Sequence, residues 1–354
     1  MITVKPFGAT PDGHNICLYT VQAGVCSMTV CDLGASLIQL KVPDRHGNLK
    51  DVVLGYDSSD LYLRPENGYM GATIGRYAGR IASGAFYLQG RAYHLTANEG
   101  IHHLHGGKNG FSFRLFSVQE TEHNGIRFSL FSPDGDEGYP GNLSFSVEYT
   151  LSETGALTIA YEAVSDRNTV VSFTNHSYFN LNGADSGKSV LNHTLAVNAD
   201  YYCDLDRQKI PKGDMVWLYG GPLDFSVPVR LSARLGRPVQ PLSSMDGLDF
   251  HFAFNGLRPN VTLYCPDTGI EMQMQSELPG AQIYTAQNLP AGIVGKGGVV
   301  YPRYAGICLE AQNYPNAPNV PSFPSSILRA GLPYSAKTVY RFSVRPTSGR
   351  RAKA

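Results

Sequence analysis

Short runs in which apolar and polar residues alternate recur along the chain, and no apolar period of 3.6 residues persists for three helical turns. Such runs occupy residues 15–54, 86–165, 190–197, 261–265, 270–276, 281–285, 306–312 and 337–345. Alternation with a period of two is typical of half-buried β-strands. Polar breaks at residues 123–125 and 153–155 favour hairpins, and residues 43–48 have the composition of a tight turn. The pattern predicts an all-β protein.

The length and the turn content favour one large domain. The chain has 354 residues, with 38 glycines and 22 prolines, and no shift of composition marks a linker. We expect a single antiparallel β domain over residues 1–347, split into two packed layers because sheets with so many strands seldom stay open. Short helices are expected at residues 58–63, capped by Ser58 or Ser59, and at 231–236. The basic tail 348–354 is expected to be frayed.

The charge balance limits the class of partner. There are 29 basic and 29 acidic residues, and charged residues make up only 16% of the chain. This balance argues against nucleic acid and acidic membranes as partners and favours a small neutral molecule. The sequence leaves a monomer and a homodimer equally open.

Cysteine usage and the N-terminus bear on location. The six cysteines form no C-x-x-C pair and lie in apolar runs, so we expect buried free thiols and a reducing compartment. No secretory h-region and no apolar run near ~18 residues is visible, which favours a cytoplasmic protein without membrane spans.

The stretch Val170–Leu181 carries an unusual polar face. Read as a strand, it points Phe173 and Asn175 toward a core. It points His176, Tyr178 and Asn180 to the opposite side. A half-buried strand more often shows lysine, glutamate or threonine on its polar side. An imidazole, a phenol and amides are suited to hydrogen bonding, so this face is a candidate site.

Three other strands show the same kind of face. Alternation places the following together: Asp249 with His251, Gln282 with Tyr284, and Cys308 with Glu310 and Gln312. Each group alone is more often a satisfied structural feature. Four such strands in a chain with little charge favour a shared polar groove.

Two loops resemble metal sites without completing one. His103 and His105 have the spacing of two ligands on one strand face, but no cysteine or carboxylate follows at a suitable position. A loop that delivers one histidine to a ligand, or a plain turn at Gly106–Gly107, is the better interpretation. Residues 132–141 start like a calcium loop but lack its later acidic positions, which favours a turn-rich loop. We expect no metal.

Common cofactor and nucleophile motifs are absent from the sequence. There is no phosphate-binding loop, no G-x-G-x-x-G before a helix and no G-x-S-x-G. What remains is a histidine and a glutamate among amides and tyrosines, which suits a neutral polyhydroxylated ligand. Imidazole exchanges protons near neutral pH, whereas a glutamate needs a raised pKa to act efficiently as a base.

Seven motifs in order resemble the aldose 1-epimerase (galactose mutarotase) family. They are GRYAGRI (75–81), LHGGKNGF (104–111), SPDGDEGYPGNL (132–143), TNHSYFNL (174–181), GLDFHF (247–252), PGAQIYT (279–285) and GICLEAQNYPNAPN (306–319). The resemblance covers about residues 8–343. It implies the galactose mutarotase-like supersandwich, a large antiparallel β-sandwich. It also implies an isomerase of galactose and hexose metabolism that interconverts α and β anomers of aldohexoses by opening the ring, without a cofactor.

The resemblance also implies roles for individual residues. Glu310 would be the general base that takes the C1 hydroxyl proton, and His176 the acid that protonates the ring oxygen. Tyr178 would lie beside His176. Sugar hydroxyls would be held by Arg76, His105, Asp249 and Gln282.

The chain departs from the family pattern at three places. Gly79 stands where the family usually has asparagine, Phe250 and His251 stand where it often has His-x-Phe, and Asn316 replaces an aspartate. These departures leave the preferred sugar open. The alternatives are an epimerase of a modified or phosphorylated sugar, a glycoside hydrolase, and a sugar-binding module or sensor without catalysis.

Overall fold

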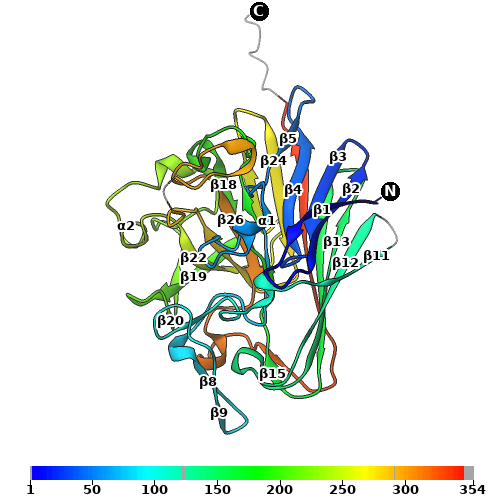
Figure 1. Ribbon diagram of the computed structural model, residues 1–354. Coiled ribbons are helices and arrows are strands. Elements are labelled where there is room, and N and C mark those ends of the chain that lie inside the picture. The colour runs from blue at the N-terminus through cyan, green and yellow to red at the C-terminus, as the bar shows by residue number, and fades with distance from the viewer. Residues whose placement is uncertain (1, 122–123, 291, 347–354) are drawn as a thin grey trace, which may run out of the picture.

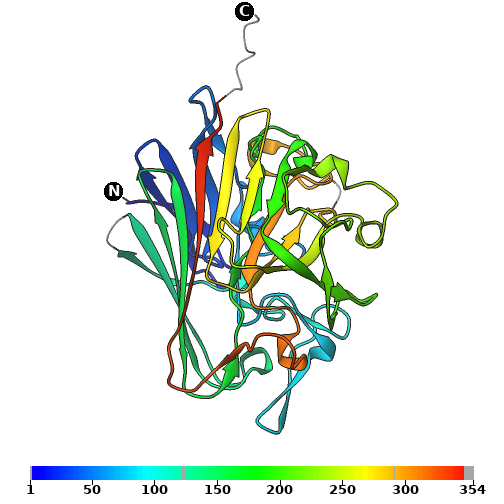
Figure 2. The same ribbon diagram turned by 180° about the vertical axis from the view of Figure 1, so that it is seen from behind.

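The computed structural model describes residues 2–121, 124–290 and 292–346, and most of its regular elements are strands (Figures 1 and 2). The largest sheet has the spatial order β11 (Ser117–Thr121), β12 (Gly125–Ser132), β13 (Leu143–Leu151), β14 (Ala156–Ser165), β28 (Tyr334–Val344), β24 (Ile270–Ser276), β23 (Val261–Tyr264), β18 (Thr194–Val197) and β21 (Val229–Arg230). Its strand pairs are antiparallel.

Two further sheets complete the framework. The six-stranded sheet has the order β17 (Tyr178–Phe179), β26 (Ile307–Gln312), β25 (Gly280–Tyr284), β22 (Asp249–Phe254), β19 (Ala199–Leu205) and β20 (Pro211–Trp217). The five-stranded sheet has the order β1 (Ile2–Ala9), β2 (Asn15–Ala23), β3 (Cys26–Cys31), β4 (Ser36–Pro43) and β5 (Leu49–Asp51). The predicted all-β antiparallel architecture is confirmed.

The remaining elements are short. The two-stranded pairs are β7 (Arg80–Ile81) with β10 (His103–Leu104), β6 (Thr73–Ile74) with β16 (Thr174–Asn175), β8 (Ala85–Leu88) with β9 (Arg91–His94), and β15 (Thr169–Val170) with β27 (Ile327–Leu328). The helices are α1 (Ser59–Tyr62) and α2 (Leu242–Met245), and the 3₁₀ turns are η1 (Ala82–Gly84), η2 (Phe111–Phe113), η3 (Asp136–Gly138), η4 (Val190–Asn192), η5 (Leu231–Ala233), η6 (Lys296–Gly298) and η7 (Ala317–Asn319).

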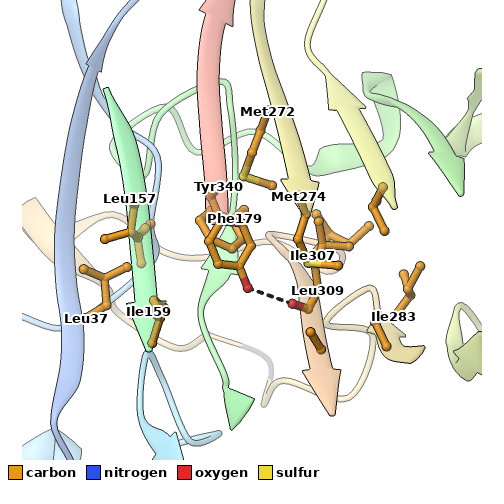
Figure 3. Packing of buried hydrophobic residues seen from close by; sticks show 14 of the residues in the cluster. Leu37, Leu157, Ile159, Phe179, Met272, Met274, Ile283, Ile307, Leu309 and Tyr340 are labelled. Carbon is orange, nitrogen blue, oxygen red and sulfur yellow. Dashed lines mark hydrogen bonds between the residues drawn. The ribbon is translucent and has the colours of Figure 1, made fainter. Parts of the chain in front are cut away.

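One hydrophobic cluster lies between the nine-stranded sheet and the two smaller sheets. Figure 3 shows side chains of β14, β24 and β28 packed against those of β17, β25 and β26. The phenol of Tyr340 on β28 donates a hydrogen bond to the carbonyl of Leu309 on β26, at 3.0 Å. Ile307, Leu309 and Ala311 therefore face the core, and by alternation Cys308, Glu310 and Gln312 face away from it.

Several local predictions can be compared with the structure. Helix α1 begins after Ser58, whose hydroxyl accepts from the Asp60 amide as an N-cap does. The residues 231–236 form only the 3₁₀ turn η5, and α2 has too few turns to show an apolar period. The turn at 43–48 joins β4 and β5, and its Asp44 carboxylate accepts from two backbone amides. The tail 348–354 and residue 123 of one predicted hairpin lie outside the described residues.

The stretch Val170–Leu181 is not the single strand that alternation predicts. It is divided into β15, β16 and β17, which pair with three different partners. Both of its faces are buried, because the chain passes through the interior between sheets instead of along an edge. Phe173 still points into the core and Asn175 is structural, as expected, since its amide donates to the Gly71 carbonyl.

The six cysteines are free, and all but the partly exposed Cys17 are buried, as predicted. Among the described residues, no helix combines the length and the apolar character that a membrane crossing requires.

Candidate active site

A pocket of about 360 Å³ opens on the face of β22, β25 and β26 that points away from the core. The strand register aligns one row of side chains across this face, His251 opposite Gln282 and Gln282 opposite Glu310. Asp249 and Tyr284 are also paired and line the same pocket. The shared polar face predicted for these three strands is therefore present.

Glu310 and His176 meet at the floor of the pocket. The Nε2 atom of His176 lies 3.6 Å from Oε1 of Glu310, and the two side chains are 5% and 2% exposed. The backbone of His176 is fixed by hydrogen bonds with residues 71 and 72, which hold the segment between β16 and β17 against the pocket. The second carboxylate oxygen, Oε2 of Glu310, is buried without a hydrogen-bond partner. A buried polar atom of this kind is available to a ligand.

Burial acts in opposite directions on the two pKa values. Loss of solvation raises the pKa of Glu310 well above its usual value, and the nearby Asp249 charge raises it further. Loss of solvation lowers the pKa of His176 to about 4. The distance alone would class the two groups as an ion pair. The burial argues instead for a neutral carboxylic acid beside a neutral imidazole in the empty pocket, because isolated charges are costly there.

The other imidazole nitrogen of His176 faces a thiol. The Cys308 sulfur lies 3.6 Å from Nδ1 of His176, and the Tyr178 ring packs on the imidazole with centroids 5.0 Å apart. The Tyr178 phenol donates to the Gly68 carbonyl at 2.7 Å. These contacts hold the ring so that Nε2 points to Glu310. Sulfur is a weak hydrogen-bond partner, so it orients the ring without the rise in pKa that a carboxylate would cause.

His105 joins the site from the loop after β10. Its ring is perpendicular to that of His176, with centroids 5.3 Å apart, and ligand atoms of His105, His176 and Glu310 lie within 4.8 Å of one another. The Gly79 amide donates to Nδ1 of His105. The neutral ring therefore carries its proton on Nε2, where it is a hydrogen-bond donor, whereas a metal ligand needs a bare nitrogen.

Asp249 and Gln282 form a second polar group. Nε2 of Gln282 donates to Oδ1 of Asp249 at 2.8 Å, and the Lys209 ammonium donates to Oδ2 at 3.1 Å. Lys209 comes from the turn between β19 and β20 and lines the pocket. Asp249 is thereby held in one orientation, with its charge balanced by a lysine.

Arg76 does not reach the pocket, and its predicted contact with sugar is wrong. Its buried guanidinium donates to the Ser132 hydroxyl and to the carbonyls of Ser132, Pro133 and Pro140. Arg76 thus holds the 132–141 loop, which forms turns as expected. The second arginine of the same motif, Arg80, lines the pocket instead and is paired with Glu99 through hydrogen bonds of 2.5 and 2.7 Å.

The two histidines of the H-x-H segment do not share a face. Nδ1 of His103 is 2.7 Å from the Thr96 carbonyl, so it donates there, and Nε2 accepts from the Tyr139 hydroxyl. His105 follows the end of β10 with a φ of +50°, which turns its side chain away from that of His103. The structure therefore supports the alternative in which the loop delivers one histidine to the site.

Sequence reasoning missed residues that loops deliver. Tyr69, whose ring contacts those of both His105 and His176, carries no periodic signal, and neither does Lys209. Asn180, expected on the site face, instead donates to the carbonyls of Lys188 and Ala305.

Comparison with known proteins matches this chain to one family. A family model described as aldose 1-epimerase matches residues 18–341. Human galactose mutarotase is 37% identical over 97% of this chain and 99% of its own length, and the Haemophilus influenzae aldose 1-epimerase is 35% identical over 97% and 100%. A solved galactose 1-epimerase from Lactobacillus acidophilus superposes with a TM-score of 0.86 at 26% identity, covering 98% of this chain and 99% of that one. An aldose epimerase homologue from C. elegans gives 0.85 at 29%, covering 93% and 99%. The chain belongs to the aldose 1-epimerase family.

Proposed function

We propose that the protein is a mutarotase that interconverts the α and β anomers of aldohexoses such as galactose and glucose. The observation that carries the proposal is the buried pair of Glu310 and His176, with one unpartnered carboxylate oxygen, on the floor of the pocket. A volume of about 360 Å³ lies in the range of small-molecule sites. Full-length relatives named galactose mutarotase and aldose 1-epimerase support the same reaction.

The proposed reaction is a pair of proton transfers. The Glu310 carboxylate takes the proton from the C1 hydroxyl, the C1–O5 bond breaks as the C1 carbonyl forms, and Nε2 of imidazolium His176 gives its proton to O5. Rotation about C1–C2 presents the other face of the aldehyde. Ring closure returns both protons and restores the starting pair. Because ring opening is redox-neutral and the protein transfers only protons to and from the sugar, the reaction as proposed needs neither a metal nor a redox cofactor.

Burial favours the first half of this cycle. The reactive pair starts as carboxylate and imidazolium and becomes carboxylic acid and imidazole as the ring opens. The raised pKa of Glu310 and the lowered pKa of His176 both favour the neutral products. An imidazolium with a pKa of about 4 is also a strong acid for a weakly basic ether oxygen.

The substrate contacts expected for His105, Tyr178, Asp249 and Gln282 remain part of the proposal, and all four residues line the pocket. The two cations at the pocket, Arg80 and Lys209, are each paired with a carboxylate. This pairing favours an unmodified sugar over a phosphorylated one. We further propose a single-domain protein, monomeric or homodimeric, in a reducing compartment such as the cytoplasm, which the buried free thiols support.

Polarimetry of freshly dissolved α-D-galactose and α-D-glucose tests the proposal. The protein should accelerate the approach to anomeric equilibrium above the rate in buffer, and a His176→Asn variant should lose that acceleration. A wild-type protein that binds galactose by calorimetry without any acceleration would establish the sugar-binding module instead.

A further inference from the structure

One corner of the pocket has no role in the proton transfers. It is formed by Gln312 on β26, which pairs with Gly280 on β25, and by His251 on β22, whose ring lies next to Gly280. The His251 ring lies so close to Gly280 that a side chain there would collide with it. On the other side, a Cβ added at Gly79 would lie 3.3 Å from Nε2 of Gln312. Because both positions are glycines, no side chain from Gly79 or Gly280 covers these two residues. We call this part of the pocket the Gln312–His251 corner.

Four polar atoms in this corner are buried without partners. They are Nε2 and Oε1 of Gln312 and Nδ1 and Nε2 of His251, and the two residues are 0% and 1% exposed. Burial lowers the pKa of His251 to about 3, so its ring is neutral. The corner therefore offers two donor atoms and two acceptor atoms. Leaving such groups unpaired is costly, which indicates that they are built to meet a polar ligand.

The balance of donors and acceptors selects the kind of ligand. A hydroxyl group both donates and accepts, so neighbouring sugar hydroxyls match this set. A phosphate or carboxylate would meet the Gln312 carbonyl oxygen, and the two cations that line the pocket are already paired with Glu99 and Asp249. The corner thus suits neutral, unmodified hydroxyls.

The position of the corner indicates which hydroxyls it meets. Gln312 follows Glu310 by two residues on the same face of β26, about 6.6 Å along the strand. That separation is comparable with the width of a hexose ring. With C1 at Glu310, the far side of the ring reaches Gln312. We propose that Gln312 and His251 bind the O3 and O4 hydroxyls of the sugar and so determine substrate preference, an inference that rests on the proposed placement of C1.

Calorimetry with 1-deoxygalactose tests this subsite without catalysis, because that sugar cannot change its anomeric form. Gln312→Leu should weaken binding roughly three- to thirtyfold, the range for one or two neutral hydrogen bonds. The same substitution should weaken binding much less for a 1-deoxygalactose analogue that also lacks the hydroxyl contacted by Gln312, either the 3-hydroxyl or the 4-hydroxyl. His251→Phe should show the same selectivity. In turnover of galactose, both variants should raise KM more than they lower kcat.

The control is Gln22→Leu, the same exchange at an exposed glutamine of β2, which should leave binding unchanged. An equal loss for 1-deoxygalactose and both of its further deoxy analogues would overturn the subsite, as would unchanged binding by both corner variants or no binding by the wild-type protein. Binding with the predicted selectivity in a protein that does not accelerate mutarotation would keep the subsite and refute only the proposed reaction.

Discussion

Replacing Glu310 with glutamine should remove activity and stabilise the empty protein. Glutamine has the shape of a protonated glutamate but cannot accept a proton. Positioned proton transfer contributes about 10²–10⁴-fold, which at about 1.36 kcal/mol per tenfold is about 2.7–5.4 kcal/mol of barrier. The kcat/KM of Glu310→Gln for α-D-galactose should fall by that factor in a polarimetric assay.

The stability gain follows from the raised pKa of Glu310. Below about pH 4.5 the carboxyl is protonated in both states, and as pH rises the unfolded chain releases its proton first, so the folded state loses stability until the folded pKa is passed. Glutamine does not titrate. The difference in unfolding free energy between variant and wild type should therefore grow as pH rises above about 4.5, at a rate that approaches about 1.36 kcal/mol per pH unit until the folded pKa is reached.

Calorimetric unfolding measures this gain. For a chain of this length we expect about 1.3 °C per kcal/mol, so Glu310→Gln should raise Tm increasingly as pH rises above about 4.5 and should change it by almost nothing at pH 4. The matched control is Glu120→Gln, at an exposed carboxylate of β11. A variant that retains activity would contradict the base assignment. A variant that is less stable than wild type at pH 6.5 would contradict the burial argument.

Three further predictions concern His176, Cys308 and His193. The Glu310–His176 pair carries one proton at neutral pH, and a second proton taken up by His176 near pH 4 leaves Glu310 protonated and unable to act as a base. The kcat/KM should therefore fall below about pH 4, and an acid limb near pH 6.5 would show that the His176 ring is not desolvated. Cys308→Ala should lower kcat about two- to tenfold with little change in KM, because the thiol orients the His176 ring without lining the pocket, and a change in KM alone would argue against that role. Burial lowers the pKa of His193 to about 3, so its neutral form stabilises the fold above pH 6.5 and this stability is lost as pH falls toward 3. A His193→Gln variant should therefore show a shallower loss of unfolding free energy between pH 6.5 and 4 than wild type, and parallel curves would refute this.

The regular part of the site could be predicted from alternation alone. In β22, β25 and β26 each strand runs straight along its neighbours, so residues two apart share a face. The spacing of the residues is then enough to place Glu310 beside Gln312 and Asp249 beside His251. The prediction succeeds there because the backbone ladder fixes the side-chain direction.

The same rule fails where the chain changes partners. Within Val170–Leu181 each short strand pairs with a different neighbour. Strict alternation therefore assigns Asn180 to the site face, although its side chain is bonded to carbonyls elsewhere. The choice between Arg76 and Arg80 is likewise made by tertiary contacts, since the carbonyls of the 132–141 loop satisfy only the first guanidinium. Loop residues such as Tyr69 follow no alternation of apolar and polar positions from which the direction of their side chains could be predicted. Only the folded chain shows that they reach the pocket.

The three departures from the family pattern converge on one segment. Gly79 lies against Pro315, with an added Cβ 3.0 Å from its ring, and His251 packs on Tyr314 with ring centroids 4.5 Å apart. Asn316 donates its amide to the Arg80 carbonyl and accepts from the Ala82 amide. Residues that touch one another or share a partner have coupled energies. The effects of substitutions at these positions on the free energies of folding and binding should therefore not be additive. The three positions therefore lie against one segment beside the Gln312–His251 corner. The Glu310–His176 pair lies outside that segment, so we expect substitutions there to affect sugar preference more than proton transfer.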